Sequence, residues 1–297
     1  MALAISVVIP AHNAAATLGD ALDSVAAQCY PVAETIVVDD GSTDGTGAMV
    51  RERYPWARVI ATPGLGPSGA RNAGIAAAQG EFVALLDADD VWHPEKLARQ
   101  AAVATDAAVA LVAADWVREK GQPWPPVPEA VPSRPVAYGD LLVLNRFQTS
   151  TVLVRRAVWA AVGGFDPSVD GAEDWDLWLR VARVGRVVKI DWPLVVYRDV
   201  PTGYSKDVWR VYETMWRMLE KHRESAPFGP KAREVLWTWH HLRFWVAFAL
   251  AGDWERAEAV RRRIGAERRW RWVPAATRRY LLPFLWQRGR RRLGGRT

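Results

Sequence analysis

Apolar strand-like runs alternate with helix-like stretches near the start of the chain, and this alternation limits the possible folds more than any other feature. Buried strands are predicted by four β-branched and apolar runs, at 5–9, 35–38, 58–61 and 82–86. Helices are predicted between them, over about 14–27, 46–53 and 68–78. Strands separated by helices form a mainly parallel sheet through right-handed crossovers, with helices on both faces. The pattern predicts an α/β, Rossmann-like fold.

Polar residues follow three of these strands directly. They are Pro10, His12 and Asn13 after the first strand, Asp39 and Asp40 at the end of the second, and Asp87, Asp89 and Asp90 after the fourth. Ligands of parallel sheets bind beyond the carboxyl ends of the strands. We therefore expect these side chains to converge on one crevice, with Asn13 also capping the first helix.

Asp87 and Asp89 are spaced to share one hard cation. Carboxylate oxygens favour Mg²⁺ or Mn²⁺, which usually also binds substrate phosphates. An acidic turn after a strand is equally common as a structural feature, so this spacing alone leaves both interpretations open. His93 follows closely, but Pro94 is typical of a helix start, and this favours a structural role for His93.

Glu173 and Asp174 begin a helix predicted over 173–184. Acids in a first turn are favoured by the helix dipole, which is the structural interpretation. In the functional interpretation, an Asp near its reference pKa of ~3.9 is ionised at neutral pH and accepts the proton of an attacking hydroxyl. Spacing alone does not select the functional interpretation.

Five segments occur in the order expected of family 2 glycosyltransferases, and the chain up to about residue 207 resembles that family. They are SVVIPAHN at 6–13, IVVDDGSTDGT at 36–46, ARNAG at 70–74, LLDADD at 85–90 and GAEDWDLW at 171–178. Each segment alone is a weak signal, whereas five in one order are specific. The resemblance implies a GT-A fold and transfer of a sugar from a nucleotide-diphosphate sugar.

The resemblance also implies roles for single residues. The nucleotide-binding residues would be Pro10, His12 with its ring on the base, Asn13, Asp40 facing the base, Arg71, and Asp87 near the ribose. Asp89, with Asp87, would hold Mg²⁺ or Mn²⁺, and Asp174 would be the general base of a direct, inverting displacement. Secondary candidates are Asp39, Glu173 and Arg198.

Two features depart from the family pattern. The segment 197–205 resembles a common Y-R-x-H-x-x-x-x-S segment, but Val200 stands at the histidine position. A metal or phosphate role for Arg198 or Ser205 is therefore not implied. The Q-x-x-R-W motif of processive polysaccharide synthases is absent, which favours the addition of one sugar to a hydroxyl of a glycan or lipid-linked acceptor.

The net charge of +6 is unevenly distributed along the chain. Residues 253–297 hold fourteen Arg and four acids, which gives +10 and leaves −4 for residues 1–252. Arginine interleaved with Trp suits anionic lipid headgroups, so we expect peripheral membrane contact through 253–297. Nucleic-acid binding would use the same residue types, but no nucleic-acid motif is present and we expect none.

The sequence also predicts where in the cell the protein acts. The longest apolar run near the end, 244–252, is shorter than the ~20 residues of a membrane span, and residues 1–19 lack a basic signal-peptide region. We expect a cytoplasmic protein, peripheral at the inner face of the cell membrane, with its single Cys29 buried.

The expected GT-A domain covers 1–206, with a nucleotide half at about 1–122 and an acceptor half at about 136–206, joined by the Pro-rich stretch 123–135. Further strands are predicted at 148–154, 187–190 and 194–197, and residues 207–297 form a helical extension. One alternative is a catalytically silent nucleotide-binding or scaffolding protein. Nucleotidyl transfer would need a Gly/Lys-rich triphosphate loop near the first strand, and none is visible. No oligomeric state is predicted.

Overall fold

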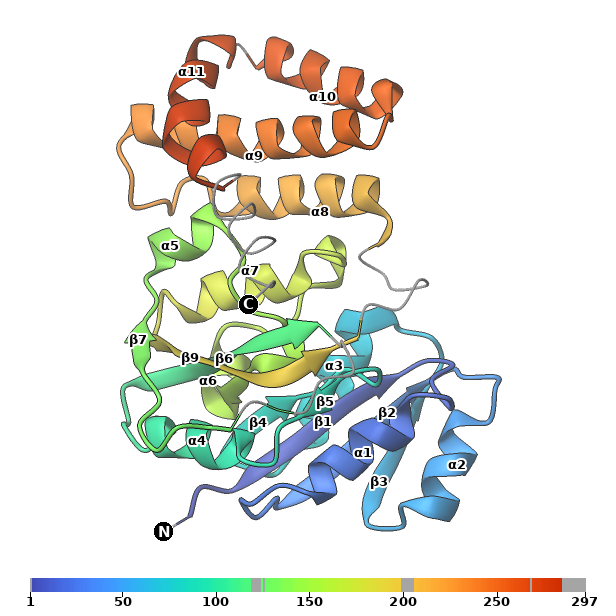
Figure 1. Ribbon diagram of the computed structural model, residues 1–297. Coiled ribbons are helices and arrows are strands. Elements are labelled where there is room, and N and C mark those ends of the chain that lie inside the picture. The colour runs from blue at the N-terminus through green and yellow to red at the C-terminus, as the bar shows by residue number, and fades with distance from the viewer. Residues whose placement is uncertain (1, 119–123, 125, 199–205, 268, 285–297) are drawn as a thin grey trace. The chain divides into compact units, whose positions relative to one another are not determined.

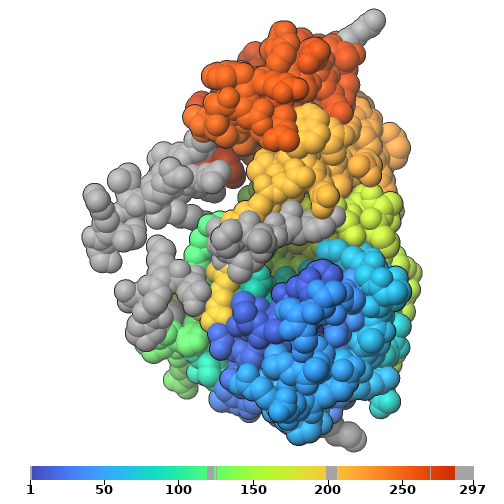
Figure 2. Space-filling model, turned by 90° about the vertical axis from the view of Figure 1, so that its right-hand side faces the viewer, coloured from blue at the N-terminus to red at the C-terminus, as the bar shows by residue number. Residues whose placement is uncertain are grey.

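The computed structural model describes residues 2–118, 124, 126–198, 206–267 and 269–284. The chain divides into two compact units, Met1–Asp207 and Val208–Thr297 (Figure 1). The first unit is a mixed sheet with flanking helices, and the second consists of helices. Figure 2 shows the N-terminal part of the first unit, in blue, as one continuous block of atoms.

The sheet of the first unit has the strand order β3-β2-β1-β4-β8-β6-β9-β5, and β7 pairs with β9. The N-terminal half of the sheet is parallel and consists of β3 (Ala57–Thr62), β2 (Glu34–Asp40), β1 (Ile5–Ala11) and β4 (Phe82–Leu85). The remaining strands are β8 (Leu153–Arg155), β6 (Val109–Arg118), β9 (Arg186–Tyr197), β5 (Val91–Trp92) and β7 (Ser133–Pro135). Of their pairings only β6 with β9 is parallel, so antiparallel pairs are confined to this half.

The central strands β1, β2 and β4 are buried along most of their length because helices cover both faces of the sheet. The helices of this unit are α1 (Leu18–Ala26), α2 (Thr46–Arg53), α3 (Gly66–Ala77), α4 (Lys96–Ala104), α5 (Tyr138–Val143), α6 (Arg156–Ala161), α7 (Glu173–Val181), and the 3-10 turns η1 (Thr149–Thr151) and η2 (Pro167–Val169). Val7 and Ile9 belong to the core that includes Leu22 of α1. On the other face, a Cβ at Gly74 of α3 would lie 2.5 Å from Val8, so α3 packs closely on β1. The expected α/β fold is confirmed.

Several predicted elements have different bounds. The first helix begins at Leu18, and Thr17 is its N-cap residue instead of Asn13. The two predicted strands near the end of the unit are one strand, β9, which runs through Pro193. The register between β6 and β9 shifts around Asp115, which pairs with Pro193, and an irregular ladder tolerates a residue without an N–H. Cys29 is exposed rather than buried.

The second unit has an aromatic core. Its elements are α8 (Val208–Lys221), α9 (Pro230–Leu250), α10 (Trp254–Ala266), the 3-10 turn η4 (Trp270–Trp272), α11 (Val273–Ala276) and the π-helical turn η5 (Thr277–Leu281). The ring centroids of Tyr212 in α8 and Phe244 in α9 are 5.2 Å apart, and the Tyr212 hydroxyl lies 2.9 Å from His241 Nδ1. The helical extension predicted from the sequence is confirmed, and none of its described helices is long and apolar enough to cross a membrane.

Candidate active site

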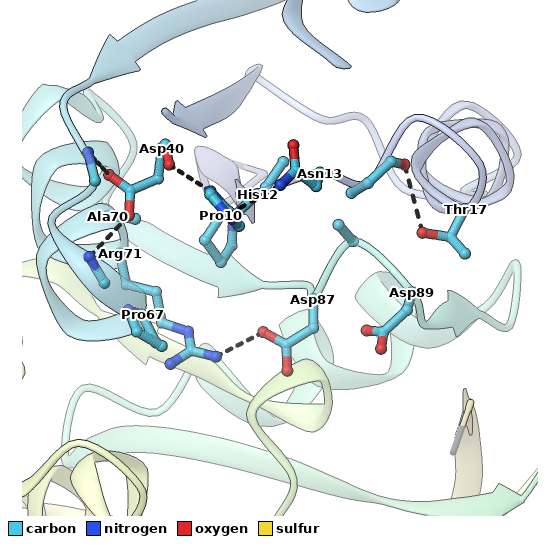
Figure 3. A pocket seen from close by; sticks show the side chains of 15 residues that line it. Pro10, His12, Asn13, Thr17, Asp40, Pro67, Ala70, Arg71, Asp87 and Asp89 are labelled. Atoms are coloured by element: carbon cyan, nitrogen blue, oxygen red, sulfur yellow. Dashed lines mark hydrogen bonds and ion pairs between the residues drawn. The ribbon is translucent and has the colours of Figure 1, made fainter. Parts of the chain in front are cut away.

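A cavity of about 610 Å³ opens where β1, β2 and β4 end (Figure 3). Its lining includes seven residues singled out in the sequence, namely Pro10, His12, Asn13, Asp40, Arg71, Asp87 and Asp89. The expected convergence of three strand ends on one crevice is therefore observed. The lining also includes Thr17, Gly64, Gly66 and Pro67, which no sequence motif had indicated. Asp39, Glu173, Asp174 and Arg198 are not part of the described lining.

Asn13 joins the first strand end to the loop that follows the second. Its backbone has a φ of +50°, a left-handed conformation that Asn tolerates better than most residues. The Asn13 N–H donates to Ser42 Oγ at 2.9 Å, and the side-chain oxygen accepts the Thr43 N–H at 2.8 Å. Through these bonds Asn13 holds the edge of the cavity. It lies too far before α1, which begins at Leu18, to cap that helix.

The imidazole of His12 is held on both nitrogens. Nδ1 lies 2.7 Å from the backbone oxygen of Asp40, and Nε2 lies 3.1 Å from the side-chain nitrogen of Asn13. A carbonyl oxygen only accepts hydrogen bonds, so the proton sits on Nδ1 and the Asn13 amide donates to Nε2. The ring is thus held in one orientation at the exposed edge of the cavity.

The carboxylate of Asp40 is buried in the cavity wall and organises the turn before α3. Oδ1 accepts hydrogen bonds from Thr62 Oγ1 at 2.6 Å and from the N–H groups of Gly64 and Leu65, while Oδ2 accepts the Gly66 N–H at 2.8 Å. Burial raises the pKa of Asp40, but these hydrogen bonds outweigh it, and the pKa lies below its usual value. Asp40 is therefore an ionised structural anion in the wall.

Asp39 points away from the cavity. Its Oδ1 accepts the Ser42 N–H at 3.2 Å. A Cβ at Gly47 would lie 2.2 Å from Asp39 Oδ2, so the carboxylate packs against the first turn of α2. Asp39 supports the loop after β2, and of the two adjacent acids only Asp40 lines the cavity.

Arg71 is a buried cation held between two carboxylates. Its NH1 donates to Glu173 Oε1 and its NH2 to Asp87 Oδ1, each at 2.8 Å. Burial lowers the pKa of Arg71, but the charges of Asp87 and Glu173 outweigh it and raise the pKa. The guanidinium therefore ties α3 to the end of β4 and to the start of α7.

Asn72 makes a second connection from α3 to the turn before α7. Its side-chain amide donates to the Phe165 oxygen and accepts the Phe165 N–H, both at 2.8 Å. Gly164, just before Phe165, has a φ of +70°, a left-handed conformation that favours glycine. The A-R-N segment at 70–72 and the G-G-F segment at 163–165 are thus in direct contact, although they lie far apart in the sequence.

Asp89 differs from Asp87 in its partners. Asp87 is paired with Arg71, whereas no hydrogen bond to the Asp89 carboxylate from another side chain is recorded within the described residues. Burial, together with the charge of Asp87, raises the pKa of Asp89 to about 6. A divalent cation would relieve this repulsion, and oxygen ligands suit Mg²⁺ or Mn²⁺.

Few side chains at this point could serve as ligands of a metal ion. The described residues contain no cluster of three or more His, Cys, Asp or Glu side chains arranged to hold a metal ion. Asp87 and Asp89 therefore fit a cation that takes its other ligands from water and substrate phosphates, as Mg²⁺ commonly does. His93 is buried against the Trp124 ring and accepts the Glu95 N–H, so its position fits the structural role at the start of α4.

Asp90 was expected to face the crevice together with Asp87 and Asp89, but it is not part of the described lining. It is fully buried, accepting hydrogen bonds from Ser150 Oγ and from the Arg198 N–H at 3.0 Å. Ser150 Oγ also accepts the Asp87 N–H at 3.0 Å. Burial and the charge of Asp87 raise the pKa of Asp90 to about 8. The only signal in the sequence was a third acid after the D-x-D, and Arg198 enters this network through its backbone.

Asp174 and Glu173 lie at the start of α7, next to the Arg71 ion pair. Glu173 Oε2 accepts the Gly171 N–H at 2.6 Å, and Asp174 Oδ2 accepts a hydrogen bond from Asn145 at 3.0 Å. Burial, followed by the charge of Glu173, raises the pKa of Asp174 to about 7. The expectation of an ordinary Asp pKa was wrong, because a sequence does not reveal burial.

Comparisons with known proteins agree with this geometry. Residues 6–158 match the model of the family described as Glycosyl transferase family 2. The amylovoran biosynthesis glycosyltransferase AmsB of Erwinia amylovora is 30% identical over 217 residues, which are 67% of this chain and 70% of AmsB. The UDP-Glc:alpha-D-GlcNAc-diphosphoundecaprenol beta-1,3-glucosyltransferase WfgD of Escherichia coli is 26% identical over 72% of this chain and 85% of WfgD.

Two other relatives match over shorter segments. These segments span 32% of this chain and 31% of an uncharacterized glycosyltransferase of Nostoc sp., and 42% of this chain and 38% of an uncharacterized glycosyltransferase of Escherichia coli. Among solved structures, the mannosyltransferase PcManGT from Pyrobaculum calidifontis in complex with GDP-Man and Mn²⁺ superposes with a TM-score of 0.63 at 22% identity, over 93% of this chain and 84% of PcManGT. The match confirms the GT-A fold.

Replacing Asp40 by Asn would turn one acceptor oxygen into an NH₂ group that faces backbone N–H groups. We expect Asp40→Asn to lower the free energy of unfolding at pH 7 by about 1–3 kcal/mol in urea denaturation. Because folding lowers the pKa of Asp40, the wild type loses this contribution as the pH falls through the folded pKa, and the difference between the proteins narrows in acid. A difference independent of pH would contradict the role of the charge.

Proposed function

The chain belongs to glycosyltransferase family 2, and from this premise we propose that it is a metal-assisted, inverting enzyme that transfers one sugar per encounter. The donor is a nucleotide-diphosphate sugar, and the acceptor is a hydroxyl of a glycan or lipid-linked substrate. The observation that carries the proposal is the double ion pair of Arg71, which links Asp87 in the cavity to Glu173, the neighbour of Asp174. A donor site and a candidate base thus share one buried connection.

The nucleotide lies in the cavity at the ends of β1 and β2. Pro10, His12 and Asn13 form one wall, and Asp40 holds the turn of the opposite wall. The His12 ring, held through both nitrogens, offers a flat surface on which a base can stack. The donors of similar proteins differ, with GDP-Man bound to PcManGT and UDP-Glc named for WfgD. The proposal therefore names nucleotide-diphosphate sugars as the class of donor, without choosing one sugar or base.

Asp89 and Asp87 would hold Mg²⁺ or Mn²⁺ beside the donor diphosphate. A cation there stabilises the negative charge that develops on the diphosphate as the anomeric C–O bond breaks. The raised pKa of Asp89 and the lack of a recorded side-chain donor to it support this assignment within the described residues. The presence of Mn²⁺ in the PcManGT complex supports it independently.

Asp174 accepts the proton of the acceptor hydroxyl. The oxygen then forms a bond to the anomeric carbon while the bond to the diphosphate breaks, so the configuration inverts. The pKa of about 7 leaves a substantial ionised fraction of Asp174 near neutral pH and makes it a stronger base than an exposed Asp. No covalent intermediate on the protein is needed.

A lipid-linked acceptor would explain the location proposed from the sequence, at the inner face of a cell membrane. The name of WfgD gives it a diphosphoundecaprenol-linked acceptor, and AmsB is named for amylovoran biosynthesis. For this chain, an acceptor in the same chemical class is a proposal that rests on these similarities.

The arginines of 253–297 are not equally available for membrane contact. Those of α10 face acids, since Arg256 pairs with Asp253, and Arg261 and Arg262 pair with Glu258. No acidic partner is recorded within the described residues for Arg271, Arg278 or Arg279. These three lie close in sequence to the exposed Trp270 and Leu282, which are 48% and 56% accessible. Residues 285–297, which complete the predicted tail, lie outside the described residues.

The catalytic assignment predicts that two substitutions stop turnover for different reasons. We expect Asp89→Ala and Asp174→Asn each to lower the rate of sugar transfer or donor hydrolysis with Mn²⁺ by at least about 100-fold. Calorimetry should show weaker Mn²⁺-dependent donor binding in Asp89→Ala and unchanged binding in Asp174→Asn. Glu52→Gln, an exposed carboxyl of α2, is the control.

Equal turnover in all variants would refute this mechanism. Tight binding of a nucleoside diphosphate without turnover of any donor would instead support the catalytically silent nucleotide-binding protein.

The membrane assignment predicts that Arg271→Gln/Arg278→Gln/Arg279→Gln weakens sedimentation with phosphatidylglycerol vesicles. Each surface arginine contributes about 1 kcal/mol near an anionic membrane, so the triple variant should bind roughly 100-fold more weakly. The matched control is Arg256→Gln/Arg261→Gln/Arg262→Gln, whose arginines face acids. Equal losses in the two variants, or none, would contradict the assignment, and binding to oligonucleotides alone would favour nucleic acid.

A further inference from the structure

The carboxylate of Asp174 receives a hydrogen bond from a residue that no motif indicated, Asn145. Asn145 lies in the loop between α5 and η1, and its Nδ2 donates to Asp174 Oδ2 at 3.0 Å. Its Oδ1 accepts the N–H of Phe147 at 3.2 Å. Because an oxygen is required on the Phe147 side, the NH₂ group must face Asp174. The orientation of the Asn145 amide is therefore set by its own loop.

The loop that carries Asn145 is fastened to the helix that carries Asp174. The indole of Trp175, the residue after Asp174, donates to the Leu141 oxygen of α5 at 2.7 Å. Leu141 and Phe147, on either side of Asn145, are both buried. Asn145 is thus held at a fixed position relative to the carboxylate.

Among the described residues, one protein donor is recorded for each oxygen of Asp174. Oδ2 accepts the Asn145 amide, and Oδ1 accepts the N–H of Trp175 at 2.5 Å. An ionised carboxylate offers about two acceptor positions on each oxygen. One position on each oxygen remains for an incoming hydroxyl, and the two donors fix the plane in which these positions lie.

We infer that Asn145 is a positioning residue for this reaction, which orients the Asp174 carboxylate and stabilises its charged form before the acceptor arrives. The inference rests on the proposed function, in which Asp174 is the base. A side-chain NH₂ favours an ionised carboxylate over a protonated one, so the hydrogen bond from Asn145 opposes the effect of burial. The donor comes from the part of the chain proposed to bind the acceptor.

Two other charged groups among the described residues are recorded as acting on the pKa of Asp174. Glu173, next to it on α7, raises its pKa, and Arg71 of α3 lowers it. Acids on the neighbouring elements have partners of their own: Asp170 with Ser68, Asp140 with the N–H of Ala137, and Asp176 with Arg180. Asn145 is the side-chain hydrogen-bond donor among the groups that act on the pKa of Asp174.

Two substitutions at Asn145 separate positioning from simple support of the loop. Asn145→Asp keeps an oxygen that accepts the Phe147 N–H but puts a carboxylate against Asp174, whereas Asn145→Ala removes both contacts. If Asn145 only supports its loop, Asn145→Ala is the more damaging change. If it positions Asp174, Asn145→Asp is the more damaging change.

The test is a pH titration of Asp174 by NMR in protein labelled with ¹³C at the Asp side-chain carboxyl, with the signal assigned by Asp174→Asn. We expect the pKa of Asp174 to rise by about 0.5 to 1 pH unit in Asn145→Ala, since a donor to the charged form is lost. It should rise further in Asn145→Asp, since a like charge is added. Gln148→Glu, which adds a charge nearby in the same loop, should shift it less. An unchanged titration in Asn145→Asp, or a larger shift in Asn145→Ala, would overturn the inference.

Turnover measured on the same proteins distinguishes the two proposals. Release of nucleoside diphosphate from UDP-glucose and from GDP-mannose, with Mn²⁺ and with water as acceptor, should be slower in Asn145→Asp than in Asn145→Ala. If Asp174→Asn turns over like the wild type while the titrations shift as expected, the proposed function fails and the pairing of Asn145 with Asp174 stands. If Asp174→Asn is inactive and the titrations do not shift, only the inference fails.

Discussion

The site depends on one buried interaction, the guanidinium of Arg71 between Asp87 and Glu173. The two carboxylates are 16 and 102 positions away in the chain, so this ion pair joins segments that the sequence keeps apart. A buried cation without its partners costs several kcal/mol, and the same holds for buried carboxylates without their cation. The cavity and the start of α7 are therefore fixed to each other, because the loss of either carboxylate or of the guanidinium would leave a buried charge without its partner.

Around this ion pair, the surroundings of each carboxyl group determine its role. Asp40 accepts hydrogen bonds from four donors and is an ionised part of the wall. Asp89 faces the cavity with a pKa of about 6, and Asp174 has a pKa of about 7, both raised first by burial. Perturbed carboxyl groups near a cavity are typical of sites that bind cations or move protons. The proposed division of roles between metal ligand and base follows from these environments.

Much of the fold and part of the site could be predicted from the sequence, because strand periodicity and strand-end acids are local signals. The strand-end residues of the cavity lining were found this way, namely Pro10, His12, Asn13, Asp40, Asp87 and Asp89. What escaped prediction depends on contacts between distant segments. Arg71 was expected near the nucleotide and does line the cavity, but its ion pairs with Asp87 and Glu173 were not predicted. Asn145 belongs to no motif, and its importance comes from the fold that brings it to Asp174. The continuity of β9 through Pro193 depends on its register with β6.

The central claim is that the cavity and Asp174 together perform a single direct displacement at the anomeric carbon. The most direct measurement is the anomeric configuration of the first transfer product, read from the proton coupling constant in NMR before the product can equilibrate. The account predicts that the configuration is inverted relative to the donor sugar. Retention of configuration would require two displacements or a different mechanism, and would contradict the account.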